Sequence, residues 1–533
     1  MTEGAFFALI PIAVAVFLIG KFAYPLLKKY SLPLSFAEAP NLKEIATWVQ
    51  RDAEVKKRLA VTLGVLLLVG AGSFIPIPGV NVRAILDVFR ELSYSLGEGH
   101  SGMISMLDMV TGGAMSRMTL FSLGIAPFFS ACILIQIALA VIPSLKRASF
   151  GGEGGREQLA EHTYSLTIIL SLLSAYFASF GIENSVGIFH QAEILTIHGW
   201  PFRLLAMATL TGGTVLLLFL AGLITRHGLG NGVAIIAVAG FPVKLFLAGR
   251  DLFAVAQETI RPVHGIPLLM ILLLFFVILT VGIYLVSQLA ATITLNNQQG
   301  DKLAVYLPPS LVGKIPTALA VNVLFLPIYL ASFTGAHEWA EYFTRTPILF
   351  NAAYILLILL FTYLYAPLVL KPHYFIDLTK KYGYAPSEGK EPDFRNHLRV
   401  KLLKLLAITG LFLAGIAVLP DLVMALLKLP PRIASVIGGV QLLVVVGVFS
   451  DIVRQLVFLK ERQESGTADW TVAYTAFDSV EATIKAQYLE GRGIRALVEP
   501  LRYTWGMPIR TIVDQYRIYT PTNRQEEARS LVA

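Results

Sequence analysis

The stretch GGAMSRMTLFSLGIAPFFSACILIQ, residues 112–136, changes from an amphipathic to an apolar pattern, and this change decides the fold. It closes the short amphipathic piece ISMLDMVTGGAMSRM (104–118) and opens an apolar run over 119–142. A bilayer core about 30 Å thick needs about 20 apolar helical residues, so the run is predicted to cross a membrane. The amphipathic piece is too short to cross. It predicts either a re-entrant helix broken at Gly112 and Gly113 or an ordinary helix in an external loop.

The whole chain, like this run, is rich in hydrophobic residues and poor in charged ones. Of its 533 residues, 55% are hydrophobic and only 15% are charged, whereas soluble domains carry about 25% charged residues. The mean hydropathy of +0.67 excludes a set of ordinary water-soluble domains. We predict an all-α polytopic membrane protein with eleven spans, over 5–27, 59–76, 119–142, 163–182, 203–225, 230–248, 266–290, 315–333, 348–370, 402–420 and 433–453.

The positive charges between these spans predict the orientation. With the N-terminus outside, the loops that become cytoplasmic hold 21 Lys and Arg residues and the opposite side holds 10. This bias agrees with the positive-inside rule only in that orientation, and it leaves the C-terminal tail in the cytoplasm. The predicted cytoplasmic loops are 28–58, 143–163, 226–229, 291–314 and 371–404.

Composition changes again near Lys460. After the polar stretch KERQESGTAD (460–469), strand-like and helix-like segments alternate as TVAYTAF, DSVEATIKAQYLEG, IRALVEP, TIVDQYRIYT and NRQEEARSLV. Asp478 is predicted to cap the first of these helices, with Glu481 three residues later, and Gly491 and Gly493 are predicted to close it. We therefore predict a small cytosolic α+β domain over 470–533.

No catalytic or metal-binding pattern is present in the sequence. Cys132 is the only cysteine and the nine histidines are isolated, so we expect neither an enzyme nor a cofactor or metal site. Charged residues avoid the interiors of the spans, which favours a passive pore over an ion-coupled transporter. The stretch HGLGNGVAIIAVAG (227–240) places Asn231 at the cytoplasmic mouth of a span. It predicts either a functional polar group or a tight turn between packed helices.

Six motifs in this order resemble the SecY family, the protein-conducting subunit of the bacterial Sec translocon. They are SFIPIPGVN (73–81), GGAMSRMTLFSLGIAPFFSACILIQ (112–136), GGEGGREQLAEHTY (151–164), GLGNGVAIIAVAG (228–240), YLPPSLVGKIPTAL (306–319) and GGVQLLVVVGVFSD (438–451). The resemblance covers roughly 42–460. It implies ten helices in two pseudo-symmetric halves, like a clamshell around a pore. The extra N-terminal transmembrane helix and linker (1–41) and the 470–533 domain lie outside it.

The resemblance also implies residues for the pore. The short external helix becomes the plug, and the third and eighth spans become a lateral gate. The implied plug residues are Met106, Met109, Gly112, Gly113, Met115 and Arg117. The implied apolar constriction consists of Ile125, Phe129, Ile133, Val233, Ala237, Ala318 and Val444. The first three recur every four residues and so share one helix face, which by periodicity alone could equally be core.

The implied function is the passage of signal-peptide-bearing polypeptides across the bacterial plasma membrane and the release of membrane segments into lipid. The implied partners are SecE-like and SecG-like subunits and either a ribosome or the SecA motor. The implied docking loops are 291–314 and 371–400, and their candidate basic residues are Lys302, Lys390 and Arg395. The first loop carries only Lys302 and Lys314, and in the second YAPSEGKEPDF replaces the Arg-bearing turn of the family. A small-solute secondary transporter and a non-conducting scaffold remain the alternative hypotheses.

Overall fold

The computed structural model describes part of the chain: residues 47–82, 84, 118–142, 144–145, 152–185, 195–240, 291–297, 302–307, 320, 347–370, 381–382, 384–386, 400, 407, 410–419, 439–464, 470–476, 479–499 and 516–532. The predicted spans at 5–27 and 266–290 lie outside these residues, as do all the implied plug residues, and Ala320 is the one described residue of the predicted span at 315–333.

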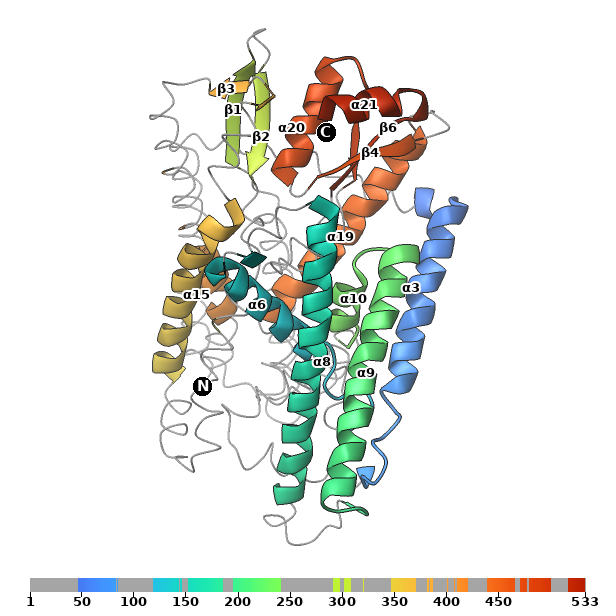
Figure 1. The fold of residues 1–533 in the computed structure, drawn as a ribbon, viewed down its shortest axis with the longest axis vertical. Coiled ribbons are helices and arrows are strands. Elements are labelled where there is room, and N and C mark those ends of the chain that lie inside the picture. Colours follow the sequence, from blue (N-terminus) through green and yellow to red (C-terminus); the bar gives the residue numbers. More distant parts are fainter. Residues whose placement is uncertain are drawn as a thin grey trace, which may run out of the picture.

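Long helices form the body of the molecule. Helices α3, α9 and α8 run side by side, and α6 lies obliquely against α8 (Figure 1). Within the described residues, two helical stretches, Gln158–Phe180 and Trp200–His227, are long and apolar enough to cross a membrane. The described helices of this body include α3 (Ala53–Gly72), α6 (Ala126–Val141), α8 (Gly152–Ser185), α9 (Trp200–His227), α10 (Gly232–Val238), α15 (Pro347–Leu370) and α19 (Gly439–Glu464).

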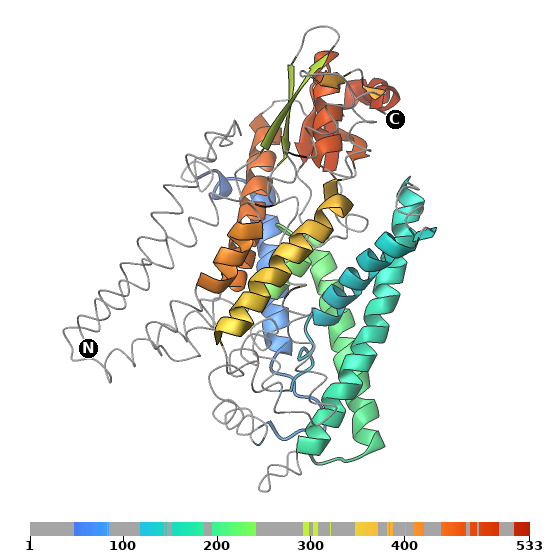
Figure 2. The ribbon, with the colours of Figure 1, turned by 90° about the vertical axis from the view of Figure 1, so that its left-hand side faces the viewer.

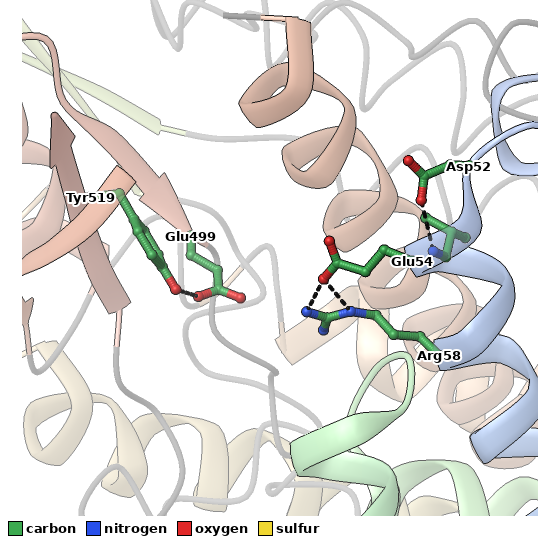
Figure 3. Close-up of polar contacts among 6 residues, drawn as sticks. Asp52, Glu54, Arg58, Glu499 and Tyr519 are labelled. Atoms are coloured by element: carbon green, nitrogen blue, oxygen red, sulfur yellow. Dashed lines mark hydrogen bonds and ion pairs between the residues drawn. The ribbon is translucent and has the colours of Figure 1, made fainter. Parts of the chain in front are cut away.

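Helix α3 begins in a polar turn and becomes apolar further along. The Asp52 carboxylate accepts a hydrogen bond from the Val55 N–H at 2.8 Å, which caps the helix, and Arg58 pairs with Glu54 one turn later (Figure 3). Beyond this turn, Leu67 and Leu68 are exposed. The helix therefore has a water-compatible start and an apolar surface suited to lipid.

Helix α8 packs against its neighbours mainly through small side chains. In lipid no hydrophobic effect drives helices together, so close packing of small residues takes its place. A stripe of mostly small residues at every fourth position is buried: Leu159, Thr163, Thr167, Ser171, Ala175 and Ser179. The hydroxyl groups of this stripe donate hydrogen bonds to carbonyls of their own helix. Large apolar side chains such as Ile169 and Leu173 are exposed on the same helix. Small residues at helix interfaces, with bulky apolar residues on the exposed faces, are typical of helices packed in lipid.

A second packing cluster joins helices from the later part of the chain. Helix α15 packs against the helix over Gly410–Leu419 and against α19 through Tyr354, Ile358, Leu413, Ala417 and Val446, with smaller neighbours. In Figure 2, α15 and α19 cross the molecule on the side away from α8 and α9. The described helices thus form two packed groups. Helix α19 contacts both of them, the group of α3, α6, α9 and α10 through Val448 and the group of α15 through Val446.

A small antiparallel sheet occupies segments that the sequence predicts only as cytoplasmic loops. Strands β1 (Ala291–Asn297) and β2 (Lys302–Leu307) form a hairpin, and β3 (Tyr384–Pro386) pairs with the other edge of β1. The β1 sequence ATITLNN is rich in β-branched residues, which favours a strand. Lys302, an implied docking residue, lies at the start of β2, whereas Lys390 and Arg395 lie outside the described residues.

The C-terminal unit is built from β4 (Trp470–Ala476), α20 (Ser479–Gly491), β5 (Leu497–Glu499), β6 (Tyr516–Pro521), the 3-10 helix η2 (Thr522–Arg524) and α21 (Gln525–Val532). The sheet is antiparallel in the order β4-β6-β5. Helices α20 and α21 pack on it through a core that includes Leu489, Ile494, Ile518 and Val532. Helix α20 ends at Gly491, and Gly493 follows in the turn with a φ of +76°. Asp478, the predicted cap, lies outside the described residues.

Candidate functional site

The turn over 118–125 positions the start of α6, where the implied constriction begins. The Leu120 N–H donates to the Ile75 carbonyl and the Ile77 N–H donates to the Met118 carbonyl, both at 2.9 Å. The Thr214 hydroxyl of α9 also donates to the Gly124 carbonyl at 3.3 Å. These contacts tie the turn to the segment after α3 and to α9, so the first turn of α6 has a fixed position.

Helix α6 begins directly after Ile125, and Pro127 sits in its first turn, where its missing N–H removes no helical hydrogen bond. Ile125 is only 1% exposed and lies in an apolar cluster that we call the collar cluster. Its buried members come from five parts of the chain: Val65 and Val69 of α3; Phe121, Ile125, Phe128 and Cys132 of the turn and α6; Leu217, Leu220, Ala221 and Ile224 of α9; Ala234, Ile235 and Ile236 of α10; and Val448 of α19.

The structure brings three of the implied constriction residues to this cluster. Ile125 is a buried member, and Phe129 and Val233 are partly buried and pack against it. Ala237 is buried on α10. Ile133 lies on α6 and Val444 lies on α19, but the structure does not describe their side chains. Ala318 lies outside the described residues.

The turn over 228–231 connects α9 to α10 and is held by polar side chains from three helices. The Leu229 N–H donates to Thr62 Oγ1 of α3 at 2.9 Å, and the Gly230 N–H donates to Gln455 Oε1 of α19 at 2.5 Å. The Gly232 N–H donates to Thr225 Oγ1 of α9 at 2.9 Å. Each bond satisfies a buried backbone donor that would otherwise lack a partner.

Asn231, predicted as a polar group at the pore mouth, caps α10 in this turn. It is 3% exposed, and its Oδ1 accepts a hydrogen bond from the Ala234 N–H at 3.1 Å. A Cβ at Gly232 would overlap the Ala221 carbonyl of α9, so this glycine allows the two helices to touch. Sequence reasoning did not find Thr62 and Gln455. Their one local signal is a polar side chain near the end of a predicted span.

Among the side chains that the structure describes, no charged one is buried on α3, α6, α8, α9, α10, α15 or α19. Among the described residues, the buried charged side chains are Glu481, Lys485 and Glu499, all in the C-terminal unit. The described residues also contain no group of His, Cys, Asp and Glu that could hold a metal ion. The collar cluster is therefore an apolar contact between α3, α6, α9, α10 and α19, and its described members include no charged side chain that could bind an ion.

Comparison of the sequence with known proteins identifies one family. A family model described as SecY matches residues 119–453. The protein translocase subunit SecY of Thermotoga maritima is 30% identical over 417 residues, covering 76% of this chain and 92% of that protein. The subunit of Staphylococcus aureus strain NCTC 8325 is 31% identical over 432 residues, covering 76% and 94%. A solved structure entitled "The structure of a protein conducting channel" covers 78% of this chain and 95% of that chain, with 16% identity and a TM-score of 0.48. The chain belongs to the SecY family.

Proposed function

We propose that the chain is a protein-conducting channel subunit that passes unfolded secretory polypeptides across the bacterial plasma membrane and releases membrane segments into it. One observation carries the proposal: Ile125, Phe129 and Val233 meet at one apolar cluster inside the region matched by the SecY family model. A narrow apolar constriction can shed water and so resist ion leakage, and it can still deform around a peptide. The subunit itself makes and breaks no bond.

The proposed constriction is completed by Ile133, Ala237, Ala318 and Val444, with residues 106–117 as the plug. Residues 42–460 would form the ten-helix clamshell, with 1–41 as an added membrane helix and 470–533 as a cytosolic domain. The N-terminus would lie outside and the C-terminus in the cytoplasm. The charge distribution supports this orientation, since 21 Lys and Arg residues then lie in cytoplasmic loops and 10 on the opposite side.

Energy for transport would come from a partner. SecE-like and SecG-like subunits would stabilise the channel, and SecA or a ribosome would deliver the polypeptide. The segment 291–314, which contains the β1–β2 hairpin, carries only Lys302 and Lys314 as basic residues. Binding to an RNA backbone depends on clustered Lys and Arg, so we expect a ribosome to bind this segment weakly.

A translocation assay separates this proposal from its alternatives. Membrane vesicles that contain the chain, supplied with cytosol and ATP, are expected to protect a secretory precursor from added protease, whereas vesicles without the chain are not. Uptake of small solutes should not depend on an ion gradient, because the described spans bury no charged side chain that could bind the coupling ion. Gradient-driven solute uptake without precursor protection would indicate the transporter. Precursor binding without protection would indicate the scaffold.

A further inference from the structure

The sheet of the C-terminal unit has two apolar faces. Helices α20 and α21 cover one face through Ile518 and its neighbours. The other face carries Trp470, Val472, Leu497 and Tyr519, and Trp470 and Tyr519 are only 6% and 7% exposed. A three-stranded sheet with helices on one side would normally present polar side chains to water on the other. The apolar second face therefore belongs to an interface.

The start of α3, the turn after α9 and the last turns of α19 cover this second face. One apolar cluster joins the sheet to α19 through Phe458 and Leu459, to α3 through Val55, and to the turn at Leu229. The rings of Phe458 and Tyr519 lie 5.7 Å apart, and the Arg462 guanidinium lies 5.1 Å from the Tyr519 ring. On the sheet itself, the Tyr519 hydroxyl donates to Glu499 at 2.8 Å (Figure 3), so its polar end is also satisfied.

The ends of α3 and α19 also touch each other beside this cluster. The Trp48 Nε1–H, from the segment just before α3, donates to Gln463 Oε1 of α19 at 2.6 Å. Deeper in, Thr62 of α3 and Gln455 of α19 hold adjacent residues of the turn over 228–231. The sheet therefore closes over a junction of three segments that are far apart in the sequence.

A separate contact links the C-terminal unit to the segment that precedes β3. The Tyr382 hydroxyl donates to the Val532 carbonyl of α21 at 3.2 Å, and its ring lies 5.0 Å from that of Tyr488 on α20. Burial raises the pKa of Tyr382 to about 12, so this hydroxyl keeps its proton at neutral pH. The unit is thus fastened at two places, one on each side of its sheet.

We propose that the C-terminal unit is an intramolecular clamp that holds the start of α3 and the end of α19 together and limits their separation. A tethered appendage would leave the second sheet face polar and would have no aromatic contacts with α19. The clamp is independent of what the channel conducts, because it concerns only the relative positions of two helices. Its release would allow the two helix ends to move apart.

Distances between spin labels test the clamp in the full chain. Labels are placed at the exposed positions Lys57 of α3 and Glu461 of α19 after Cys132→Ala, and a specific protease site is inserted between 464 and 470. With the unit attached, one narrow distance distribution is expected. After cleavage the docked unit should remain bound and the distribution should be unchanged.

The variant Tyr519→Asp places a charge in the interface. After cleavage we expect it to release the unit into the supernatant and to move or broaden the label distance by about 2 Å or more, the scale of helix shifts at interfaces. Arg495→Asp introduces the same residue at an exposed position of the unit and should behave like the unchanged protein. If Tyr519→Asp unfolds the unit, the clamp is lost as well, and the same change in the label distance is expected. An unchanged label distance after release would overturn the proposal, as would loss of the unchanged unit on cleavage.

Discussion

Gly213→Ala is expected to destabilise the membrane part of the protein by about 3 kcal/mol or more, the upper range for overpacked sites. A Cβ at Gly213 of α9 would overlap the Leu120 carbonyl. Because this atom belongs to the backbone, it cannot rotate away. The Leu120 N–H is in turn bound to the Ile75 carbonyl, so the turn before α6 cannot shift without breaking that bond.

The neighbouring Gly212 provides a matched control. A Cβ there meets nothing within 4 Å, and alanine favours a helix over glycine by about 1 kcal/mol, so Gly212→Ala should be neutral or slightly stabilising. Thermal unfolding of both variants in detergent measures the difference. Equal stabilities for Gly212→Ala and Gly213→Ala would show that α9 does not approach the turn as closely as described.

Lys485→Met is expected to destabilise the C-terminal unit by about 3–5 kcal/mol, the cost of breaking a buried ion pair. The Lys485 ammonium lies 3.2 Å from Glu481 Oε1, and the two side chains are only 4% and 2% exposed. The ammonium also donates to the Val532 carbonyl at 2.7 Å and lies over the Tyr474 ring. Without Lys485, the Glu481 carboxylate stays buried with the Tyr474 hydroxyl as a neutral donor.

The double variant Glu481→Gln/Lys485→Met removes both charges and should recover most of this loss. Pulse proteolysis in urea measures the stability of residues 470–532 in each variant. If the double variant is as unstable as Lys485→Met, the ion pair is not the source of the effect.

The pH dependence of the unit's stability follows from the same pair. Burial lowers the pKa of Lys485 from 10.5 to about 8, with Glu481 opposing the shift. The unfolded chain therefore binds more protons between pH 8 and 10.5, and the stability of the unit should rise over that range. The neutral Lys485 amine, unlike methionine, still donates hydrogen bonds to Glu481 and to the Val532 carbonyl, so this rise is compatible with the loss expected for Lys485→Met. The rise should be absent from Glu481→Gln/Lys485→Met. Tyr382 faces the same site, but it remains neutral there because burial raises its pKa to about 12.

The apolar runs predict where helices cross lipid, but they do not predict where helices end. The predicted span at 59–76 corresponds to α3, which starts earlier, at Ala53, because Asp52 caps a polar first turn. Likewise α8 starts at Gly152, before the predicted span at 163–182, and α19 continues to Glu464, past the predicted end at 453. Hydropathy detects the segment surrounded by lipid, whereas helical hydrogen bonds continue into water.

The contacts that join distant segments have no local signal in the sequence. The pairing of β1 with β3 and the hydrogen bond from Gly230 to Gln455 each join residues that are far apart in the chain. The docking of the β4-β6-β5 sheet on α3 and α19 also joins distant segments, so the sequence does not predict it. The apolar side chains on the second face, Trp470 and Tyr519, are its one local signal. The resemblance predicts Ile125 and Phe129 as constriction residues, but no local pattern predicts that they pack with α9 and α10.

Crosslinking of a stalled secretory chain is the most direct test of a protein-conducting channel. A photoreactive amino acid is placed at Phe129, at the edge of the collar cluster, and in a separate protein at Phe219, an exposed position of α9. After irradiation in vesicles that translocate the precursor, adducts with the stalled chain are expected from position 129, with only background from position 219. Equal adduct yields at both positions, in vesicles that still protect the precursor from protease, would contradict a path through the collar.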